Sequence, residues 1–325
     1  MGIVSNSLRI CSGRDLGPLR PVAGKLDCVE RPMTDVRPEM IPAARAKLLR
    51  KQELAIARKY ANRLPWEAVI WGIGNLLIWL SLWPLVFMEL IPLWLGFVIA
   101  TFNVMLCYLP SHEAQHDIIG RKGTKWRWLN ELVGHASTIP LALPYRVAKL
   151  THIQHHLHAN DRERDPDHSS LAPGPWQAVM KSMHNRQPGA KGGFNKYGVI
   201  LEDIGRPDVL IDGALYQIVH FGILIGLALS GYVWEAVLLW WLPRQIGLTY
   251  IQFFLSWAPH HPGYGKGRYK DTRAFKSSWG NIGSMGMQYH IVHHLHPYIP
   301  LTDTPAAYRD MRDILEQRGC RLEGI

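Results

Sequence analysis

The chain has 325 residues, of which 47% are hydrophobic, and a formal net charge of +10 at pH 7. Such a charge is typical of proteins that bind nucleic acid, an anionic membrane surface or an acidic protein, and the sequence contains no recognisable nucleic-acid-binding motif. The four cysteines are scattered without a CxxC pair, which argues against a disulfide scaffold or a cysteine metal site. Several long apolar runs point instead to a membrane protein.

The first part of the chain is polar. Residues 1–41 contain many glycines and prolines without periodicity, and we expect a flexible tail there. Residues 42–64 are rich in helix formers, with apolar side chains set among basic ones, which predicts a helix lying on the membrane face. A solvated helix leading into the first span is the alternative. Residues 1–65 hold no apolar run typical of a cleaved signal peptide, so none is expected.

Four apolar segments approach the ~20 residues that a membrane-spanning helix needs. We predict two hairpins, the first at residues 66–83 and 92–109, the second at residues 212–230 and 232–257. Gly231 alone separates the two spans of the second hairpin. Arg244 lies beside Pro243 in the last span, where a charge is costly. It indicates either a helix break that faces the bundle interior or a misplaced boundary.

Basic residues precede the first span and follow the second, so the positive-inside rule places both ends of that hairpin in the cytoplasm. Residues 132–147 are apolar but too short for a span and carry two prolines, which favours a half-buried interfacial segment. The predicted fold is all-α: a domain over residues 42–310 with four transmembrane helices and a cytoplasmic, histidine-rich helical cap, followed by a tail at residues 311–325. We expect location in the inner (cytoplasmic) membrane, with both termini and the active site on the cytoplasmic side.

Three histidine-rich motifs lie at or beyond the inner ends of these spans. They are SHEAQH with His112 and His116, THIQHH with His152, His155 and His156, and YHIVHH with His290, His293 and His294. Helix positions i, i+3 and i+4 share a face, so an HxxHH motif can give two ligands to one ion and a third to its neighbour. Imidazole suits several metals, but a catalytic zinc takes three protein ligands, whereas eight histidines can supply two ions. We therefore predict two iron ions that activate O2 for attack on an unactivated C–H bond.

Other polar residues near the motifs are candidates for the same site. His260, in WAPHHPG at the end of the fourth predicted span, is as well suited to be a further ligand as to lie at the membrane interface. Carboxylates and amides can accept the second ring N–H of a ligand histidine, with a solvated loop position as the alternative for each acid. The candidates for such outer contacts are Asp117, Asn160, Asp161, Asp165 and His135.

Two other functions compete with an oxygenase. HEAQH is also the HExxH signature of zinc proteases, with Glu113 as general base and Asp212 of LIDG as a further acidic residue. This intramembrane protease would leave both HxxHH motifs unused. A non-catalytic metal transporter would need a polar path through the spans, for which the sequence offers Gln217, His220 and Arg244.

The three boxes across four spans resemble the membrane fatty-acid desaturase superfamily, over roughly residues 66–308. The strings HEAQH, GHAS, HIQHHLHANDRERDPDH, APHHP and YHIVHHLHPYIP are similar to those of the desaturase-like β-carotene hydroxylases. That resemblance implies the eight box histidines as iron ligands, His260 as a candidate further one, and O2-dependent 3-hydroxylation of a carotenoid β-ionone ring with electrons from a ferredoxin. Desaturation of a fatty-acyl lipid or acyl-CoA by the same centre is the alternative. Glu113, in place of a more usual Asp, and His296, in place of Trp, depart from the pattern.

Overall fold

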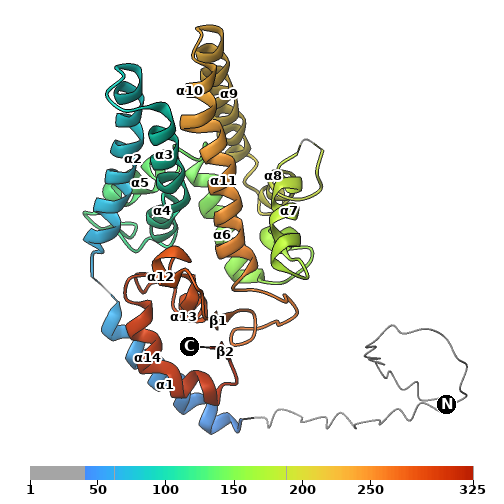
Figure 1. Ribbon diagram of the computed structural model, residues 1–325. Helices are drawn as coiled ribbons and strands as arrows, with labels where there is room; N and C mark the ends of the chain where they lie inside the picture. Colours follow the sequence, from blue (N-terminus) through green and yellow to red (C-terminus); the bar gives the residue numbers. More distant parts are fainter. Residues whose placement is uncertain (1–40, 62, 188, 325) are drawn as a thin grey trace, which may run out of the picture. The chain divides into compact units, whose positions relative to one another are not determined.

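The structure is a computed structural model, which describes residues 41–324 except 62 and 188 (Figure 1). The tail predicted for residues 1–41 falls outside these residues apart from Ile41. Within the described part the chain is mostly helical, with one short pair of parallel strands.

The predicted N-terminal helix forms as α1 (Ala43–Tyr60). The first hairpin follows as α2 (Trp66–Phe87) and α3 (Leu93–Leu106), and α3 runs on into α4 (Tyr108–Gln115). Three helical stretches are long and apolar enough to cross a membrane: Trp66–Phe87, Leu93–Gln115 and α9 (Asp208–Leu229). Many apolar side chains of α9 are exposed, Leu229 at 84% among them, as expected of a surface that faces lipid.

The segment predicted as the fourth span is helical but broken. It consists of α10 (Val233–Ala236), the π-helical η2 (Val237–Trp241), α11 (Leu242–Ile251) and the π-helical η3 (Gln252–Trp257). Gly231, with a φ of 91°, makes the turn from α9. The π-helical turn of η2 precedes Pro243, which has no N–H to donate. The buried Arg244 donates from Nε to the carbonyl of Leu141 at 2.7 Å, so of the two alternatives the structure has the helix break that faces the interior.

The middle of the chain supplies five helices: α5 (Arg127–Ala136), α6 (Tyr145–His158), the 3-10 helix η1 (Pro166–Ser170), α7 (Pro175–Asn185) and α8 (Phe194–Asp203). Residues 132–147, predicted to be a half-buried interfacial segment, form the end of α5, a loop and the start of α6, and most of their side chains are buried. In the loop, the side chains of Trp240, Arg244 and Gln217 donate to three successive carbonyls, those of residues 140–142.

The C-terminal part contains β1 (Arg273–Phe275), α12 (Gly280–Gly283), the 3-10 helix η4 (Met287–Tyr289), α13 (His290–Leu295), α14 (Thr304–Gln317) and β2 (Arg321–Glu323). Strands β1 and β2 pair in parallel, with Arg273 opposite Arg321. The boundary predicted at residue 310 falls inside α14. Met311 and Leu315 of this helix are buried in one core with Ile291 of α13, because their spacing of four residues places both on the same helix face.

Candidate metal centre

Nine histidines from four segments of the chain come together. Their ring nitrogens form two clusters, and within each cluster all of these atoms lie within 4.8 Å of one another. Cluster 1 contains His112, His116, His152, His156 and His293, and cluster 2 contains His155, His260, His290 and His294. The structure thus brings together all eight box histidines and His260.

Each HxxHH motif contributes its first and last histidines to one cluster and its middle histidine to the other. In α6, His152 and His156 point to cluster 1 and His155 points to cluster 2. In α13 the pattern is reversed, because His290 and His294 belong to cluster 2 and His293 to cluster 1. Positions i and i+4 share one helix face, while the residue next to them is rotated by about 100°. Each of these two helices therefore contributes histidines to both clusters.

His260 reaches cluster 2 from the end of the broken helix. It follows η3, where the amide of Ala258 bonds back five residues to the carbonyl of Phe253 at 2.8 Å. Such a widened turn holds one extra residue and shifts the direction of the side chains that follow, and π-helical turns are frequent at functional sites. The sequence pattern gives no direct signal for this turn.

Too many ring nitrogens in cluster 1 lie at hydrogen-bonding distance from one another for hydrogen bonds alone to satisfy them. His152 Nε2 is 2.9 Å from His116 Nε2 and 3.1 Å from His156 Nε2, which in turn is 3.0 Å from His293 Nε2. A ring nitrogen carries either one proton or one lone pair, so it cannot satisfy two nitrogen neighbours. His112 is fully buried and neither of its ring nitrogens has a hydrogen-bond partner. Ligands bound at about 2.1 Å and at right angles are about 3.0 Å apart, so these side chains fit a metal ion.

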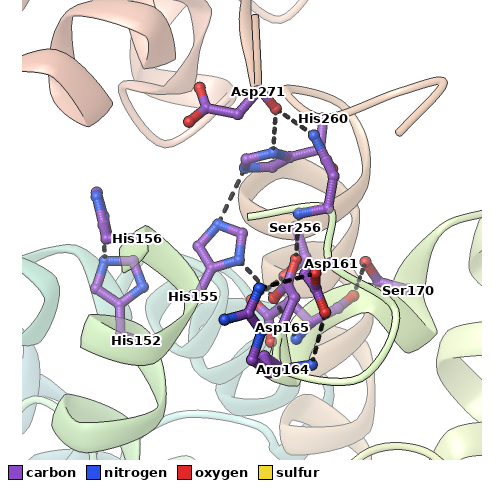
Figure 2. Close-up of polar contacts among 12 residues, drawn as sticks. His152, His155, His156, Asp161, Arg164, Asp165, Ser170, Ser256, His260 and Asp271 are labelled. Atoms are coloured by element: carbon purple, nitrogen blue, oxygen red, sulfur yellow. Dashed lines mark hydrogen bonds and ion pairs between the residues drawn. The ribbon is translucent and has the colours of Figure 1, made fainter. Parts of the chain in front are cut away.

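Cluster 2 shows the same convergence, with His260 Nε2 lying 3.1 Å from His155 Nε2 and 3.2 Å from His290 Nε2. Figure 2 shows His155 between His260 and Asp165, and His260 beside the carbonyl of Asp271. The Nδ1 atoms of His155 and His260 point away from the cluster and donate to Asp165 Oδ1 at 2.8 Å and to Asp271 O at 2.9 Å. Both rings therefore present Nε2 to the cluster, as a metal ligand requires.

Burial sets the charge of most of these imidazoles. It holds the pKa well below the ordinary value of 6.5 in His116, His152, His156, His290, His293 and His294. They are therefore neutral at pH 7, which is the form that binds a metal ion. Burial also lowers the pKa of His155, but the Asp165 carboxylate outweighs burial and raises the pKa to about 9, so a metal ion that binds Nε2 would displace a proton from this ring.

Two of the predicted outer contacts, Asp165 and Asn160, are next to cluster 2. Besides His155, Asp165 accepts the backbone N–H groups of Asn160 and Asp167, each at 2.8 Å. The Asn160 amide donates to the carbonyls of Gly265 and Asp271 at 2.7 and 2.6 Å. Asn160 therefore fixes the acceptor of His155 and that of His260 together. Asp271, whose carbonyl binds His260, was not predicted, because it lies in a loop with no motif.

The other predicted outer contacts lie elsewhere. Asp117 forms ion pairs with Arg127 and Lys149, and Asp161 accepts from Lys266 and from backbone N–H groups in its own loop. These carboxylates are bound by cations and amides rather than by box histidines. His135 packs against the ring of Tyr145 and belongs to neither cluster.

Of the residues proposed for a zinc protease, His112 and His116 belong to cluster 1, but the two acidic residues have other partners. Glu113 is on the same helix as His112 but accepts the backbone N–H of Leu301, and Asp212 pairs with Arg146 at 2.9 Å. A general base must reach the water on the metal, and Glu113 is turned toward Leu301 instead.

An inner cavity of about 120 Å³ reaches both clusters. Its wall includes His152 of cluster 1, and His155 and His290 of cluster 2. Apolar side chains make up much of the remainder, among them Leu143 and Leu255. An apolar group can therefore approach the metal centre from this side.

Comparison with known proteins agrees with the histidine pattern. The chain is 24% identical over 225 residues to an sn-1 oleoyl-lipid 12-desaturase of Anabaena variabilis, over 219 residues to a dihydrorhizobitoxine desaturase of Bradyrhizobium elkanii, and over 213 residues to an sn-1 acyl-lipid omega-3 desaturase (ferredoxin) of Nostoc. These alignments cover 61%, 58% and 56% of this chain and 63%, 59% and 54% of the relatives, so the chain spans less than two thirds of their length.

A sequence model of the fatty acid desaturase family matches residues 88–323, a region that contains both clusters. The match covers well over half of the chain and confirms the resemblance seen in the three boxes. The chain therefore belongs to the fatty acid desaturase family.

Proposed function

We propose that this protein is a membrane-embedded, O2-dependent oxidoreductase with a non-haem di-iron centre. The observation that carries the proposal is the sorting of nine buried and half-buried histidines into two clusters with ligand spacing. The proposed iron ligands are the eight box histidines and His260. Two iron ions bound there would supply an oxidant, formed from O2, strong enough to attack an unactivated C–H bond.

The proposed topology has four spans with the histidine clusters on the cytoplasmic side. Three long apolar helices support it, as does the helical, though broken, segment Val233–Trp257. The basic residues that flank the first hairpin support the orientation. Both termini would then lie in the cytoplasm.

The chain's own residues supply binding and orientation. Asp165 holds the Nδ1 proton of His155, and the Asp271 carbonyl holds that of His260, so each ring keeps Nε2 free for a ligand bond. The apolar wall of the inner cavity, including Leu143, Ile251 and Leu255, would bind a hydrocarbon and exclude water.

Two substrates are candidates. Hydroxylation of a carotenoid β-ionone ring is supported by the run HANDRERDPDH, which contains Asn160 and Asp165 beside cluster 2. Desaturation of an acyl chain is supported by the names of the relatives.

The electrons would come from an acidic carrier of the ferredoxin type. The net charge of +10 supports this proposal, and one relative is named a ferredoxin-linked desaturase.

Expression in a host that makes β-carotene would separate the two substrates. Chromatography of the pigments and analysis of the fatty acids would be done on the same cells. Hydroxylated carotenoid supports the first candidate, and new unsaturated acyl chains support the second. If neither appears while the protein is present in the membrane with iron bound, both substrate proposals fail.

His155→Ala and His293→Ala test the metal centre, since each removes one proposed ligand from a different cluster. We expect both variants to lose turnover and iron relative to the unaltered protein. His184→Ala, at an exposed position of α7, is the matched control. Full activity in both cluster variants would contradict the di-iron assignment.

A further inference from the structure

Arg186 lies where two cavities meet. The inner cavity, which reaches the histidine clusters, is lined by one side of the α11–η3 stretch, including Leu248 and Ile251. An outer cavity of about 620 Å³ is lined by the other side, including Ile246 and Phe253. Among the residues that line these two cavities, Arg186 is the one they share.

The guanidinium group of Arg186 is held in place by neutral acceptors. Its Nη1 donates to Ser182 Oγ at 2.7 Å, its Nη2 to Thr249 Oγ1 at 2.6 Å, and its Nε to Gln245 Oε1 at 3.2 Å. A second, longer bond joins Nη2 to the Gln245 carbonyl. The group is thus oriented by α7 and α11 together, while part of the cation remains on the cavity walls.

The positive charge has no acidic partner in the described part of the chain, where the acceptors of Arg186 are hydroxyl, amide and carbonyl oxygens. Half-burial lowers the pKa of Arg186 to about 10, and burial is its sole cause. Asp167, on the wall of the inner cavity, is bound by Tyr197 and Ser256 instead. By contrast, Arg146 contacts two carboxylates. A desolvated cation normally has a counter-charge, and here the protein does not supply it.

Arg186 lies beside a helix that is suited to the membrane interface, where lipid head groups lie. It follows directly after α7, an amphipathic helix whose exposed side carries Trp176, Met180 and Met183. Exposed apolar residues at this spacing are typical of a helix lying in a membrane interface. Met183 also lines the outer cavity, so a chain leaving the bilayer along α7 would pass Arg186 before reaching the histidines.

We propose that Arg186 binds the oxyanion of an amphiphilic substrate, a carboxylate or a phosphate at the end of an acyl chain. Carboxylate and phosphate oxygens both accept from a guanidinium N–H. Four of the five N–H groups of Arg186 are bonded within the protein, which leaves one on Nη1, together with the positive charge, for the anion. This inference rests on the proposed function and narrows its substrate class: an uncharged carotenoid would leave the Arg186 charge unpaired, whereas an anionic acyl amphiphile compensates it.

Binding to the purified full-length protein in uncharged detergent tests the proposal without turnover. Equilibrium dialysis at about pH 8, where a carboxylate and the arginine are both ionised, would compare radiolabelled oleic acid with oleyl alcohol, which has the same chain and no charge. Oleoyl lysophosphatidic acid, which carries a phosphate on the same acyl chain, is the third ligand. Its affinity relative to that of oleic acid shows whether the site prefers a head-group phosphate or a free carboxylate. We expect an anion to bind about 10-fold or more tightly than the alcohol. Equal affinity for all three ligands would overturn the proposal without any variant.

Arg186→Gln removes the charge and keeps hydrogen-bonding capacity. It should remove the preference for the anion and leave the affinity for oleyl alcohol within about twofold. Arg186→Lys keeps the charge without the planar fork and should retain part of the preference. Arg206→Gln is the matched control, since Arg206 pairs with Asp208 outside both cavities and its loss changes the net charge equally. Equal loss of anion binding in the Arg206 and Arg186 variants would make the effect one of overall charge and contradict the proposal.

Iron analysis of the same preparations separates this inference from the proposed function. A protein that selects oleate through Arg186 but holds no iron would support the anion site and contradict the di-iron centre. A protein that binds iron but shows no preference for the anion would support the di-iron centre and contradict the anion site.

Discussion

Asp165 links the loop after α6 to the metal centre. One carboxylate oxygen accepts from His155 Nδ1, and both oxygens accept backbone N–H groups from the loop. Carboxylates of this kind fix the ring orientation and the tautomer of a ligand histidine. Asp165 is therefore the residue through which the HANDRERDPDH run contributes most directly to the chemistry.

Asp165→Asn should weaken iron binding by about 10- to 100-fold, because a neutral amide replaces the ionised carboxylate that accepts the His155 N–H. The iron affinity is measured from the amount of iron bound per chain during titration with a chelator of known affinity. Asp161→Asn is the control, since Asp161 contacts Lys266 and its own loop rather than a histidine. An Asp165 variant that holds iron as tightly as the control would show that the carboxylate has no such role.

At the residue scale, the sequence predicts what depends on local spacing. The box histidines share helix faces, so their grouping follows from the pattern of three and four residues. Spacing does not show that Asp117 contacts Arg127 and Lys149 rather than a box histidine, because these contacts depend on how α5 and α6 pack around it. The contact between Asn160 and Asp271 spans more than a hundred residues and depends on the tertiary fold.

At the element scale, α3 and α11 pack closely enough to need a glycine. A Cβ on Gly247 of α11 would lie 2.7 Å from Cγ1 of Val104 on α3, and 3.3 Å from the Val104 backbone. Gly222 of α9, by contrast, has no atom within 4 Å of such a Cβ among the neighbours considered. Close contact between α3 and α11 also holds the segment that leads to His260.

Gly247→Ala should lower the free energy of unfolding by roughly 1–3 kcal/mol, because the two helices must separate to admit the methyl group. Gly222→Ala should be neutral or slightly stabilising, since alanine is the better helix former. Thermal unfolding in detergent would measure both. Similar melting temperatures for the two variants would mean that the contact between α3 and α11 is not tight.

Several contacts join helix α1 to the C-terminal part of the molecule, and one of them is made by a buried carboxylate. Glu53 is fully buried, accepts from Tyr269 and Arg268, and lies 3.0 Å from His296 Nε2. Burial raises the pKa of Glu53, but the bonds from His296, Tyr269 and Arg268 together outweigh burial and lower it to about 2. His296, which departs from the family pattern, thus has a structural partner in α1.

Glu53 should make stability depend on acid pH. Because its pKa is lowered from 4.5 to about 2 on folding, its contribution is complete above about pH 5 and is lost as the pH falls toward 2. Glu53→Gln should be less stable at neutral pH by roughly 2 kcal/mol, and the difference from the unaltered protein should shrink on acidification. Melting temperatures at several pH values would check this, with exposed Glu202→Gln as control. A pH-independent difference would contradict the assignment.

The broken fourth segment marks the limit of prediction at this scale. Its apolar composition predicts a single span, whereas the structure has two π-helical turns. Pro243 and Arg244 signal the first break. The second, in η3, has no proline or charge to indicate it, because it depends on the packing that places His260 in cluster 2.

At the scale of the whole molecule, the clusters connect segments from both ends of the chain: α4, α6, the residues after η3, and α13. Helix α13 has six residues, too few to be stable alone. Metal bound to the clusters would therefore stabilise the folded chain by linking these segments. The sequence predicts this convergence from the shared position of the boxes at the inner ends of spans. The packing of α14 and the β1–β2 pair is beyond it, because residues 311–325, which include the second half of α14 and β2, were predicted to be a tail.

Removing the metal should lower the melting temperature by several degrees, since an ion that binds the folded state alone stabilises that state in proportion to its affinity. The measurement is thermal unfolding of the iron-loaded protein before and after chelation, followed by addition of ferrous iron. Recovery of the original melting temperature is expected with iron. A melting temperature unchanged by chelation, with iron loss verified, would argue against a structural link through the clusters.

The division of each HxxHH motif between the clusters would fix the distance between two ions bound in them. His155 and His156 are neighbours on one helix, as are His293 and His294, yet the members of each pair serve different clusters. The spacing of the clusters is thus set twice by covalent geometry, along two separate backbones. Helix α6 gives two histidines to cluster 1 and one to cluster 2, and α13 gives one to cluster 1 and two to cluster 2. The backbone of either helix alone would therefore fix the distance between two bound ions, whatever the packing between the helices.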